Sequence, residues 1–296
     1  MLFPLKVIVS LVQALLIVGR FQPDVVIGTG GYVSWPVMMA AVLLRRRTVL
    51  QEQNWMPGVV TRVLTPYVDS VHLSFETSVR FFKNRSNLHV SGNPTRENLG
   101  GFSREEGYRR FGLESGLTTL FVFGGSQGAL SINKAVLAFL NRLISRENVQ
   151  ILWATGPRWF EKIEKEVEIY GDRVRVLPYV RKMGMAYGVS DLLICRAGAT
   201  TIAEVTRVGL PGVFIPFHGA AGGHQEENVR VMWQAGAAEM VLEDQVEEGR
   251  LEEVVFSLLD DPDRREEMGR RAKEFGRPHA ARTIVDDVLC QVNRDC

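Results

Sequence analysis

A glycine-rich run with one hydroxyl is the first feature of this sequence that suits a chemical role. It consists of Gly124, Gly125, Ser126, Gln127 and Gly128. It follows β-branched and aromatic residues and precedes a helical pattern. Glycines let a backbone approach a ligand closely, and a helix N-terminus offers N–H groups with partial positive charge. This arrangement suits a diphosphate, although a tight turn without a ligand is the alternative. The spacing matches neither the dinucleotide fingerprint nor a P-loop.

A second loop of this kind occurs in the first half of the chain. Gly28, Gly30, Gly31 and Tyr32 follow the short apolar run at residues 25–27, and a helical pattern comes next. The loop has no lysine or arginine, so only backbone donors would serve an anion. Two such loops predict two ligand-binding α/β halves with a cleft between them.

A carboxylate lies close to a third strand end. Arg196, Gly198 and Thr201 follow the apolar residues 191–195, and Glu204 comes within about one turn of the next helix. A carboxylate there can accept hydrogen bonds from two ribose hydroxyls and is favoured by the helix dipole. The alternative is a plain capping carboxylate.

A polar, glycine-rich loop spans residues 218–228. Gln225 and Asn228 offer donors and acceptors for sugar hydroxyls. His218 and His224 lack further ligands at metal-binding spacing, apart from two adjacent glutamates, and the chain has no Asp-x-Asp pair. We therefore expect no metal and no cofactor, with helix N-termini holding the anion instead.

Strand and helix patterns alternate along the chain, which predicts parallel sheets with crossover helices. We expect helices at residues 35–44, 131–144 and 159–170, and strands at 48–50, 118–123, 149–154 and 174–177. A charged linker near Asn98 separates a first domain, 1–98, from a second domain, 99–296, that ends in a helical tail. The chain opens on a helix rather than on a strand and glycine loop, so the first domain is expected to be incomplete.

Composition and the N-terminal residues argue against a nucleic-acid-binding protein, a membrane-spanning helix and a signal peptide. A formal net charge of +1 in 296 residues, without a long basic run, does not favour nucleic-acid binding. Residues 1–18 are apolar but interrupted by polar side chains, shorter than a spanning helix and without signal-peptide features. We expect an amphipathic helix packed on a sheet.

The motifs taken together resemble the MurG family. The resemblance rests on residues 23–34, Glu52-Gln53-Asn54, Gly92-Asn93-Pro94 with Arg96, the 124–128 loop, residues 195–199, Glu204, and His224-Gln225 with Asn228. The family transfers N-acetylglucosamine from UDP-N-acetylglucosamine to lipid I, which gives lipid II in peptidoglycan synthesis. The resemblance implies an α/β GT-B fold, two Rossmann-like domains facing across a cleft, and an inverting reaction that needs no metal.

The resemblance also assigns residues to ligands. It implies that the donor UDP-sugar is bound by Gly124, Gly125, Ser126, Gln127, Gly128, Val180, Arg196, Thr201, Glu204 and Gln225. It implies that the acceptor diphosphate lies against Gly30, Gly31 and Tyr32, with Asn54 and Arg96 lining the cleft.

Two departures from the family pattern concern the general base. The family begins with a strand and a glycine-rich loop that carries a histidine, and this chain has neither. It also has Gln51 where members usually have histidine. Glu52 is then the best candidate for the catalytic base, because the acceptor hydroxyl must pass its proton to a group within hydrogen-bond reach.

Other functions stay open beside transfer to lipid I. One is a non-catalytic or inactive UDP-sugar-binding fragment of such an enzyme. Another is a related transferase with a different lipid acceptor, such as a diacylglycerol. A dinucleotide-dependent oxidoreductase is disfavoured by the spacing of both glycine loops.

A polyprenyl-linked acceptor implies a peripheral enzyme at the cytoplasmic face of the bacterial plasma membrane. Residues 35–44 followed by Arg45, Arg46 and Arg47 form an apolar stretch with a basic edge, which suits an anionic surface. The alternative is a buried crossover helix whose basic end complements its dipole.

Overall fold

The computed structural model describes residues 2–83, 85–219 and 223–293, which form two compact units. The first unit comprises Met1–Pro94 and Arg277–Cys296, and the second comprises Thr95–Gly276. The chain therefore changes unit four residues before the predicted boundary at Asn98. The assignment of the whole C-terminal tail to the second domain is wrong for residues 277–293, which pack with the first unit.

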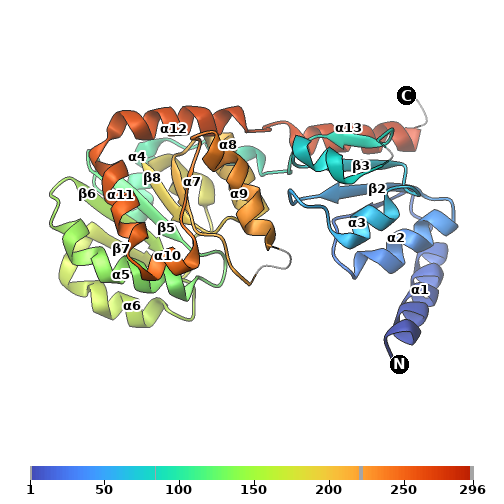
Figure 1. Ribbon diagram of the computed structural model, residues 1–296, viewed down its shortest axis with the longest axis horizontal. Coiled ribbons are helices and arrows are strands. Elements are labelled where there is room, and N and C mark those ends of the chain that lie inside the picture. The colour runs from blue at the N-terminus through green and yellow to red at the C-terminus, as the bar shows by residue number, and fades with distance from the viewer. Residues whose placement is uncertain (1, 84, 220–222, 294–296) are drawn as a thin grey trace. The chain divides into compact units, whose positions relative to one another are not determined.

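The first unit is built on a four-stranded parallel sheet in the order β1-β2-β3-β4 (Figure 1). Its strands are β1 (Val25–Gly28), β2 (Arg47–Glu52), β3 (Ser70–Leu73) and β4 (Leu88–Val90). Its helices are α1 (Leu2–Phe21), α2 (Ser34–Leu43), α3 (Val59–Leu64) and α13 (Ala280–Asn293), with a 3-10 helix η1 at Glu76–Phe81. Met38 of α2 packs with Leu50, Leu64 and Leu73 in the core of this unit.

The helix predicted at residues 35–44 is confirmed as α2, a crossover between β1 and β2. Met38, Ala40 and Ala41 are buried, whereas Val37 and Leu43 are exposed. Because the chain must cover one face of the sheet to return for a parallel strand, burial of one side of α2 follows from the topology. The interpretation of this segment as a buried crossover helix is therefore correct for one side of α2, whereas the other side is exposed.

Helix α1 differs from its prediction in length and in its packing partner. It runs for 20 residues and packs through Ala14 and Val18 against Ala40 of α2, rather than on the sheet. Only 11% of residues 4–21 are buried, and most of its large apolar side chains face outward. Within the described residues it is the one helix long and apolar enough to cross a membrane, so the expectation that it is too short and too polar is wrong.

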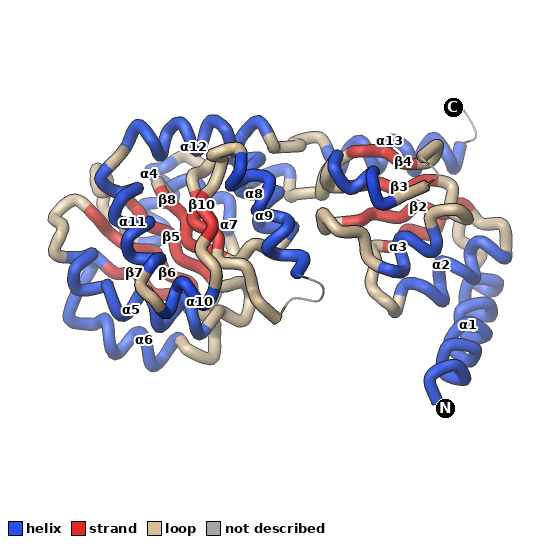
Figure 2. The backbone as a smooth tube through the Cα atoms, viewed as in Figure 1, coloured by secondary structure: helices blue, strands red, loops and turns tan. Residues whose placement is uncertain are grey.

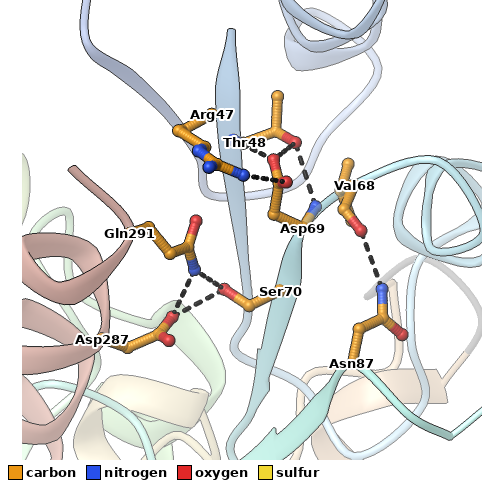
Figure 3. A network of polar contacts seen from close by, with 8 residues as sticks. All are labelled: Arg47, Thr48, Val68, Asp69, Ser70, Asn87, Asp287 and Gln291. Carbon is orange, nitrogen blue, oxygen red and sulfur yellow. Dashed lines mark hydrogen bonds and ion pairs between the residues drawn. The ribbon is translucent and has the colours of Figure 1, made fainter. Parts of the chain in front are cut away.

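Helix α13 is attached to the first unit by a polar cluster around Asp287 (Figure 3). Ser70 Oγ and Gln291 Nε2 donate to Asp287 Oδ2 at 2.7 and 2.9 Å, and His72 Nε2 lies 2.9 Å from the same oxygen. Burial lowers the pKa of His72, so the ring is neutral near pH 7 and Nε2 carries the donated proton. Burial alone would raise the pKa of Asp287, but these three hydrogen bonds lower it overall.

The second unit has a six-stranded parallel sheet in the order β10-β9-β8-β5-β6-β7, with helices on both faces (Figure 2). Its strands are β5 (Thr118–Phe123), β6 (Val149–Ala154), β7 (Val174–Leu177), β8 (Leu192–Cys195), β9 (Gly212–Phe214) and β10 (Glu239–Met240). Strand order reverses between β5 and β8, whose last residues, Phe123 and Cys195, are partners in the ladder. Loops that leave the two strands therefore start side by side, which is the usual location of a ligand site in such sheets.

The helices of this unit cover a core formed by β5, β6, β8 and their crossovers. They are α4 (Arg104–Phe111), α5 (Leu130–Ile144), α6 (Phe160–Val167), α7 (Met183–Val189), α8 (Ala199–Val208), α9 (His224–Gln234), α10 (Glu243–Glu247), α11 (Arg250–Asp260) and α12 (Pro262–Glu274), with 3-10 helices η2 (Glu97–Gly100) and η3 (Glu168–Arg173). The predicted helix at 131–144 is confirmed, and the one at 159–170 ends earlier, at Val167. Helix α7 was missed by the sequence patterns.

Removal of the Asp287 carboxylate should destabilise the first unit. Asp287→Ala leaves the buried His72 without its acceptor, which we expect to lower the free energy of unfolding by about 2 kcal/mol. Chemical denaturation followed by circular dichroism measures the change. The matched control is Asp286→Ala. The Asp286 carboxylate is exposed and makes a weak ion pair, 3.8 Å long, with the exposed Arg282, so its removal should cost little. Equal effects of the two substitutions would contradict the role given to Asp287.

Candidate functional site

A cavity of about 690 Å³ lies at the carboxyl edge of the second sheet. Its walls come from the loops after β5, β8 and β9 and from the starts of the helices that follow. The predicted residues that line it are Gly124, Gly125, Gly128, Arg196, Thr201 and Gln225. Because parallel strands present their carboxyl ends at one edge, segments about 100 residues apart in sequence meet in one site.

The glycine loop after β5 has both a structural and an open part. Gly128 has a φ of +74°, and a Cβ atom there would lie 1.9 Å from the Thr155 carbonyl oxygen, so only glycine fits. Gly125 has a φ of +90° but no atom within 4 Å of the same position. The tight-turn explanation therefore accounts for Gly128, whereas the space at Gly125 admits a ligand next to the backbone.

Three helices begin at this cavity without a side-chain cap. Ala129, Gly198 and Gly223 are the N-cap residues of α5, α8 and α9, and none of them forms a side-chain capping hydrogen bond. The first N–H groups of a helix have no partner within the helix, and a polar N-cap usually satisfies one of them. Together the three helix ends give the cavity a positive potential suited to a diphosphate.

The side chain of Arg196 stabilises the wall of the cavity. Its guanidinium donates to Glu243 Oε1 at 2.6 Å, to Ser131 Oγ at 2.9 Å, and to the backbone oxygens of Ile215 and Pro216. Glu243 Oε2 accepts the His218 N–H at 3.1 Å. Burial opposes ionisation of Glu243, but hydrogen bonds led by that from Arg196 lower its pKa overall. Arg196 thus braces the loop after β9 rather than presenting a free cation.

Gln225 contacts the same loop through the oxygen of its side-chain amide. Its Oε1 accepts the Phe217 N–H at 3.0 Å, and among the described residues its Nε2 hydrogens have no acceptor. Residues 220–222 of the predicted sugar-binding loop lie outside the described residues. The side chain that the sequence singled out is therefore oriented at the start of α9, with its donors available.

Glu204 lies one turn beyond Thr201 on α8, and its carboxylate is in contact with a tyrosine. Tyr187 Oη donates to Glu204 Oε2 at 2.9 Å. Burial raises the pKa of Glu204, while the hydrogen bond from Tyr187 and the charge of Arg96 act in the opposite direction. Arg96 belongs to the second unit, and its charge acts on Glu204 and Tyr187 of the same unit. This location argues against grouping Arg96 with the acceptor residues of the first unit.

The remaining predicted donor residues are not among those that line the cavity. Ser126 and Gln127 are exposed on the glycine loop, and Val180 is buried after β7. Sequence reasoning missed several lining residues, namely Ser131, Lys134, Phe217, Glu243 and Glu247. The helical spacing of Ser131 and Lys134 at the start of α5 was a usable signal for that face, but the fold brings Glu243 in from a distant segment.

The acceptor residues predicted in the first unit gather at the carboxyl ends of β1 and β2. Gly30 and Gly31 have successive φ values of +81° and +75°, and Tyr32 is 85% exposed. Their loop follows β1, and the segment containing Asn54 follows β2, which pairs with β1. A Cβ atom at Gly30 would lie 4.0 Å from Thr61 Oγ1, so the loop after β1 lies beside α3, the helix that follows the Asn54 segment.

Glu52 has the surroundings of a structural carboxylate. It is only 5% exposed, its Oε1 accepts the Asn54 N–H, and its Oε2 accepts the Gly58 N–H at 2.9 Å and the Thr61 hydroxyl at 2.7 Å. A general base must reach the acceptor hydroxyl with a free lone pair. The carboxylate of Glu52 accepts hydrogen bonds from the loop after β2 and from α3. These bonds argue against its assignment as the general base.

Loss of the Glu243 carboxylate should loosen the loop after β9. In Glu243→Ala the His218 N–H loses its acceptor and Arg196 loses its ion pair. We expect amide hydrogen exchange across residues 215–218 to accelerate roughly fivefold, as for the loss of one hydrogen bond of about 1 kcal/mol. Mass spectrometry of peptides covering this loop measures the rate. Glu248→Ala, an exposed glutamate at the end of the same helix, is the control. Unchanged protection in Glu243→Ala would show that the brace is unimportant.

Comparison with protein families agrees with the arrangement of these loops. Residues 119–284 match the glycosyltransferase family 28 C-terminal domain, and residues 1–73 match the glycosyltransferase family 28 N-terminal domain. A protein of Chlorobaculum tepidum named UDP-N-acetylglucosamine–N-acetylmuramyl-(pentapeptide) pyrophosphoryl-undecaprenol N-acetylglucosamine transferase is 43% identical over 280 residues, which cover 95% of this chain and 76% of the relative. A protein of the same name from Halothermothrix orenii is 38% identical over 283 residues, 93% and 76% of the two chains.

Solved structures show the same fold. Acinetobacter baumannii MurG superimposes with a TM-score of 0.76 at 26% identity, covering 97% of this chain and 79% of that protein. A UDP-GlcNAc 2-epimerase from Neisseria meningitidis bound to UDP-GlcNAc has a TM-score of 0.69 at 13% identity over 96% and 81% of the chains, which concerns the fold alone. The predicted fold class, α/β of the GT-B type, is confirmed. With relatives at about 40% identity over nearly the whole chain, this protein belongs to the MurG family of N-acetylglucosamine transferases.

Proposed function

We propose that this protein transfers N-acetylglucosamine from UDP-N-acetylglucosamine to lipid I, a polyprenyl-diphosphate-linked muramyl peptide, and so makes lipid II for peptidoglycan. The observation that carries the proposal is the cavity at which three uncapped helix N-termini meet beside an open glycine loop, in a chain of the MurG family. That cavity suits the diphosphate of a nucleotide sugar, because backbone N–H groups and helix dipoles neutralise phosphate oxygens.

The donor is proposed to bind along the carboxyl edge of the second sheet. Gly125 and Ser126 with the start of α5 hold the diphosphate, and the backbone at Val180 lies against uracil. Glu204 accepts the ribose hydroxyls, and Arg96 is assigned to this side because its charge acts on Glu204. Thr201 and the free Nε2 of Gln225 serve the sugar or its phosphate.

The acceptor is proposed to bind the first unit. Gly30 and Gly31 direct backbone N–H groups at its diphosphate, Tyr32 is exposed beside them, and Asn54 lies on the adjoining loop. The acceptor hydroxyl attacks the anomeric carbon from the side opposite UDP and so inverts the configuration. The bond from that carbon to the diphosphate oxygen breaks, UDP leaves with the electron pair, and the hydroxyl proton passes to a base or to solvent. Charge that develops on the leaving diphosphate is stabilised by the helix N-termini, which are positioned before the reaction begins. Glu52 is given a supporting role, since it fixes the loop that carries Asn54.

The donor proposal predicts a strong effect of Glu204. Glu204→Ala should weaken binding of UDP-N-acetylglucosamine roughly 30-fold, because hydrogen bonds to a charged group are lost. Calorimetry with the purified chain measures the affinity, and Glu164→Ala, an exposed glutamate of α6, is the control. No binding by the unaltered, folded protein would refute the proposal. Binding without formation of lipid II from lipid I would favour a UDP-sugar-binding protein that does not catalyse transfer.

We further propose that the protein is peripheral to the cytoplasmic face of the plasma membrane and attaches through α1. The outward side of this helix exposes Ile8, Leu16, Ile17 and Phe21 by 59–79%. A helix with such a face lies in the boundary between headgroups and acyl chains, where basic residues such as Arg20 meet anionic lipids. An acceptor anchored in the bilayer is then within reach of the first unit.

The membrane proposal predicts loss of vesicle binding when the apolar face is charged. Leu16→Glu combined with Ile17→Glu should abolish co-sedimentation with vesicles of phosphatidylcholine and phosphatidylglycerol, since burial of two carboxylates in the interface is costly. Ile169→Glu charges an equally exposed side chain in the second unit and should have no effect. Retention of vesicle binding by the double variant would exclude α1 as the attachment site.

A further inference from the structure

Tyr187 is a buried tyrosine in contact with the proposed ribose-binding carboxylate. It lies on α7 and is only 1% exposed. The centre of its ring lies 6.1 Å from that of Phe121 and 6.2 Å from that of Phe123, both on β5. Among the residues that the structure describes, the hydrogen-bond partner of its hydroxyl is Glu204, at 2.9 Å. A buried hydroxyl needs such a partner, so the ring and the carboxylate fix each other.

The packing makes Tyr187 the rigid member of the pair. A tyrosine has two side-chain torsions, and here both are restricted by the neighbouring aromatic rings of the strand. Glu204 is half-buried at the surface of α8, with three torsions of its own. A hydrogen bond from the fixed hydroxyl to Oε2 selects one orientation of the carboxylate and leaves the lone pairs of Oε1 for another donor.

We propose that Tyr187 is a positioning residue for sugar-nucleotide binding, because its hydroxyl holds Glu204 Oε2 so that Oε1 is presented to the ribose hydroxyls. The inference rests on the proposed function, in which Glu204 binds the ribose of the UDP-sugar. A preoriented acceptor binds a diol more tightly, since less side-chain freedom is lost on association.

The same contact favours the ionised form of Glu204. Burial raises the pKa of this carboxyl, whereas the Tyr187 hydrogen bond and the Arg96 charge lower it. On the tyrosine side, burial and the nearby Glu204 and Cys195 raise the pKa of Tyr187 well above its usual value, with Arg96 opposing them. The hydroxyl therefore keeps its proton and remains the donor, and the carboxylate remains the acceptor. These are the titratable and charged groups that act on the pair within the described part of the chain.

The first test compares the unaltered protein with Tyr187→Phe, which keeps the ring packing and removes the donor. We expect the affinity for UDP-N-acetylglucosamine, measured by calorimetry at pH 8, to fall roughly tenfold, as for one hydrogen bond to a charged group. At pH 5.5 the loss should be larger, because removal of the donor raises the pKa of Glu204 further and protonates it earlier as the pH falls. Thermal unfolding confirms that the variant is folded, and Tyr108→Phe removes a surface hydroxyl of the same unit as the control.

The second test asks whether Tyr187 acts through Glu204. In a Glu204→Ala background, which has no acceptor for the tyrosine hydroxyl, Tyr187→Phe should cause no further loss of affinity, because the contact between the two side chains is already absent. Glu204→Asp, which keeps the charge and the tyrosine but shortens the reach, should weaken binding as well.

The outcomes separate the two proposals. No binding of UDP-N-acetylglucosamine by the unaltered protein overturns the proposed function itself. Binding by the unaltered protein that is equal in Tyr187→Phe at both pH values overturns only the positioning role. A full additional loss in the Glu204→Ala background also overturns it, since Tyr187 would then act on the ligand by another route.

Discussion

The pairing of β5 with β8 is the constraint on which the candidate site depends. These strands are separated by two intervening strands in sequence, yet Phe123 and Cys195 are partners in the ladder. Their crossovers leave in opposite directions across the sheet, so the loops that follow them diverge and leave a hollow. Helices α5 and α8 start on either side of it, and the next strand outward adds the start of α9. The contribution of the helix N-termini to a positive potential in the cavity is thus a product of strand order, and it adds to the charge of Lys134, which also lines the cavity.

Two conspicuous charged side chains, Arg196 at the cavity and Glu52 in the first unit, act on the protein itself. The Arg196 guanidinium is used by Glu243, Ser131 and two backbone carbonyls, and the Glu52 carboxylate by two N–H groups and a hydroxyl. A buried charge is tolerated only when its hydrogen-bonding capacity is used, so conspicuous ionisable residues in a loop are often its supports. The groups at the cavity that face a ligand are chiefly backbone N–H groups, the Gln225 amide and Lys134, to which the proposal adds the carboxylate of Glu204.

Residue patterns predicted much of the fold, and the helix and the contacts that they missed were missed for different physical reasons. The strand and glycine signals at 118–128 and the helix at 131–144 are local in sequence, and the structure agrees with them. Helix α7 has seven residues, too few for a clear period, although a parallel connection between β7 and β8 requires a crossover. Tyr187 was overlooked with it. The partners of Arg196 and Asp287 lie up to 217 residues away, and single-sequence patterns hold no information on such pairs.

The attachment of α13 to the first unit has a consequence for the order of folding during synthesis. Ser70 and Asp287 are 217 residues apart, so the ribosome delivers the sheet of the first unit long before the helix that completes it. The second unit is continuous in sequence, from Thr95 to Gly276, and has all its strands before α13 is made. Domains generally fold as units while the chain emerges. The unit whose synthesis starts first therefore finishes last, and until then His72 of the nascent chain has no Asp287 to accept its proton.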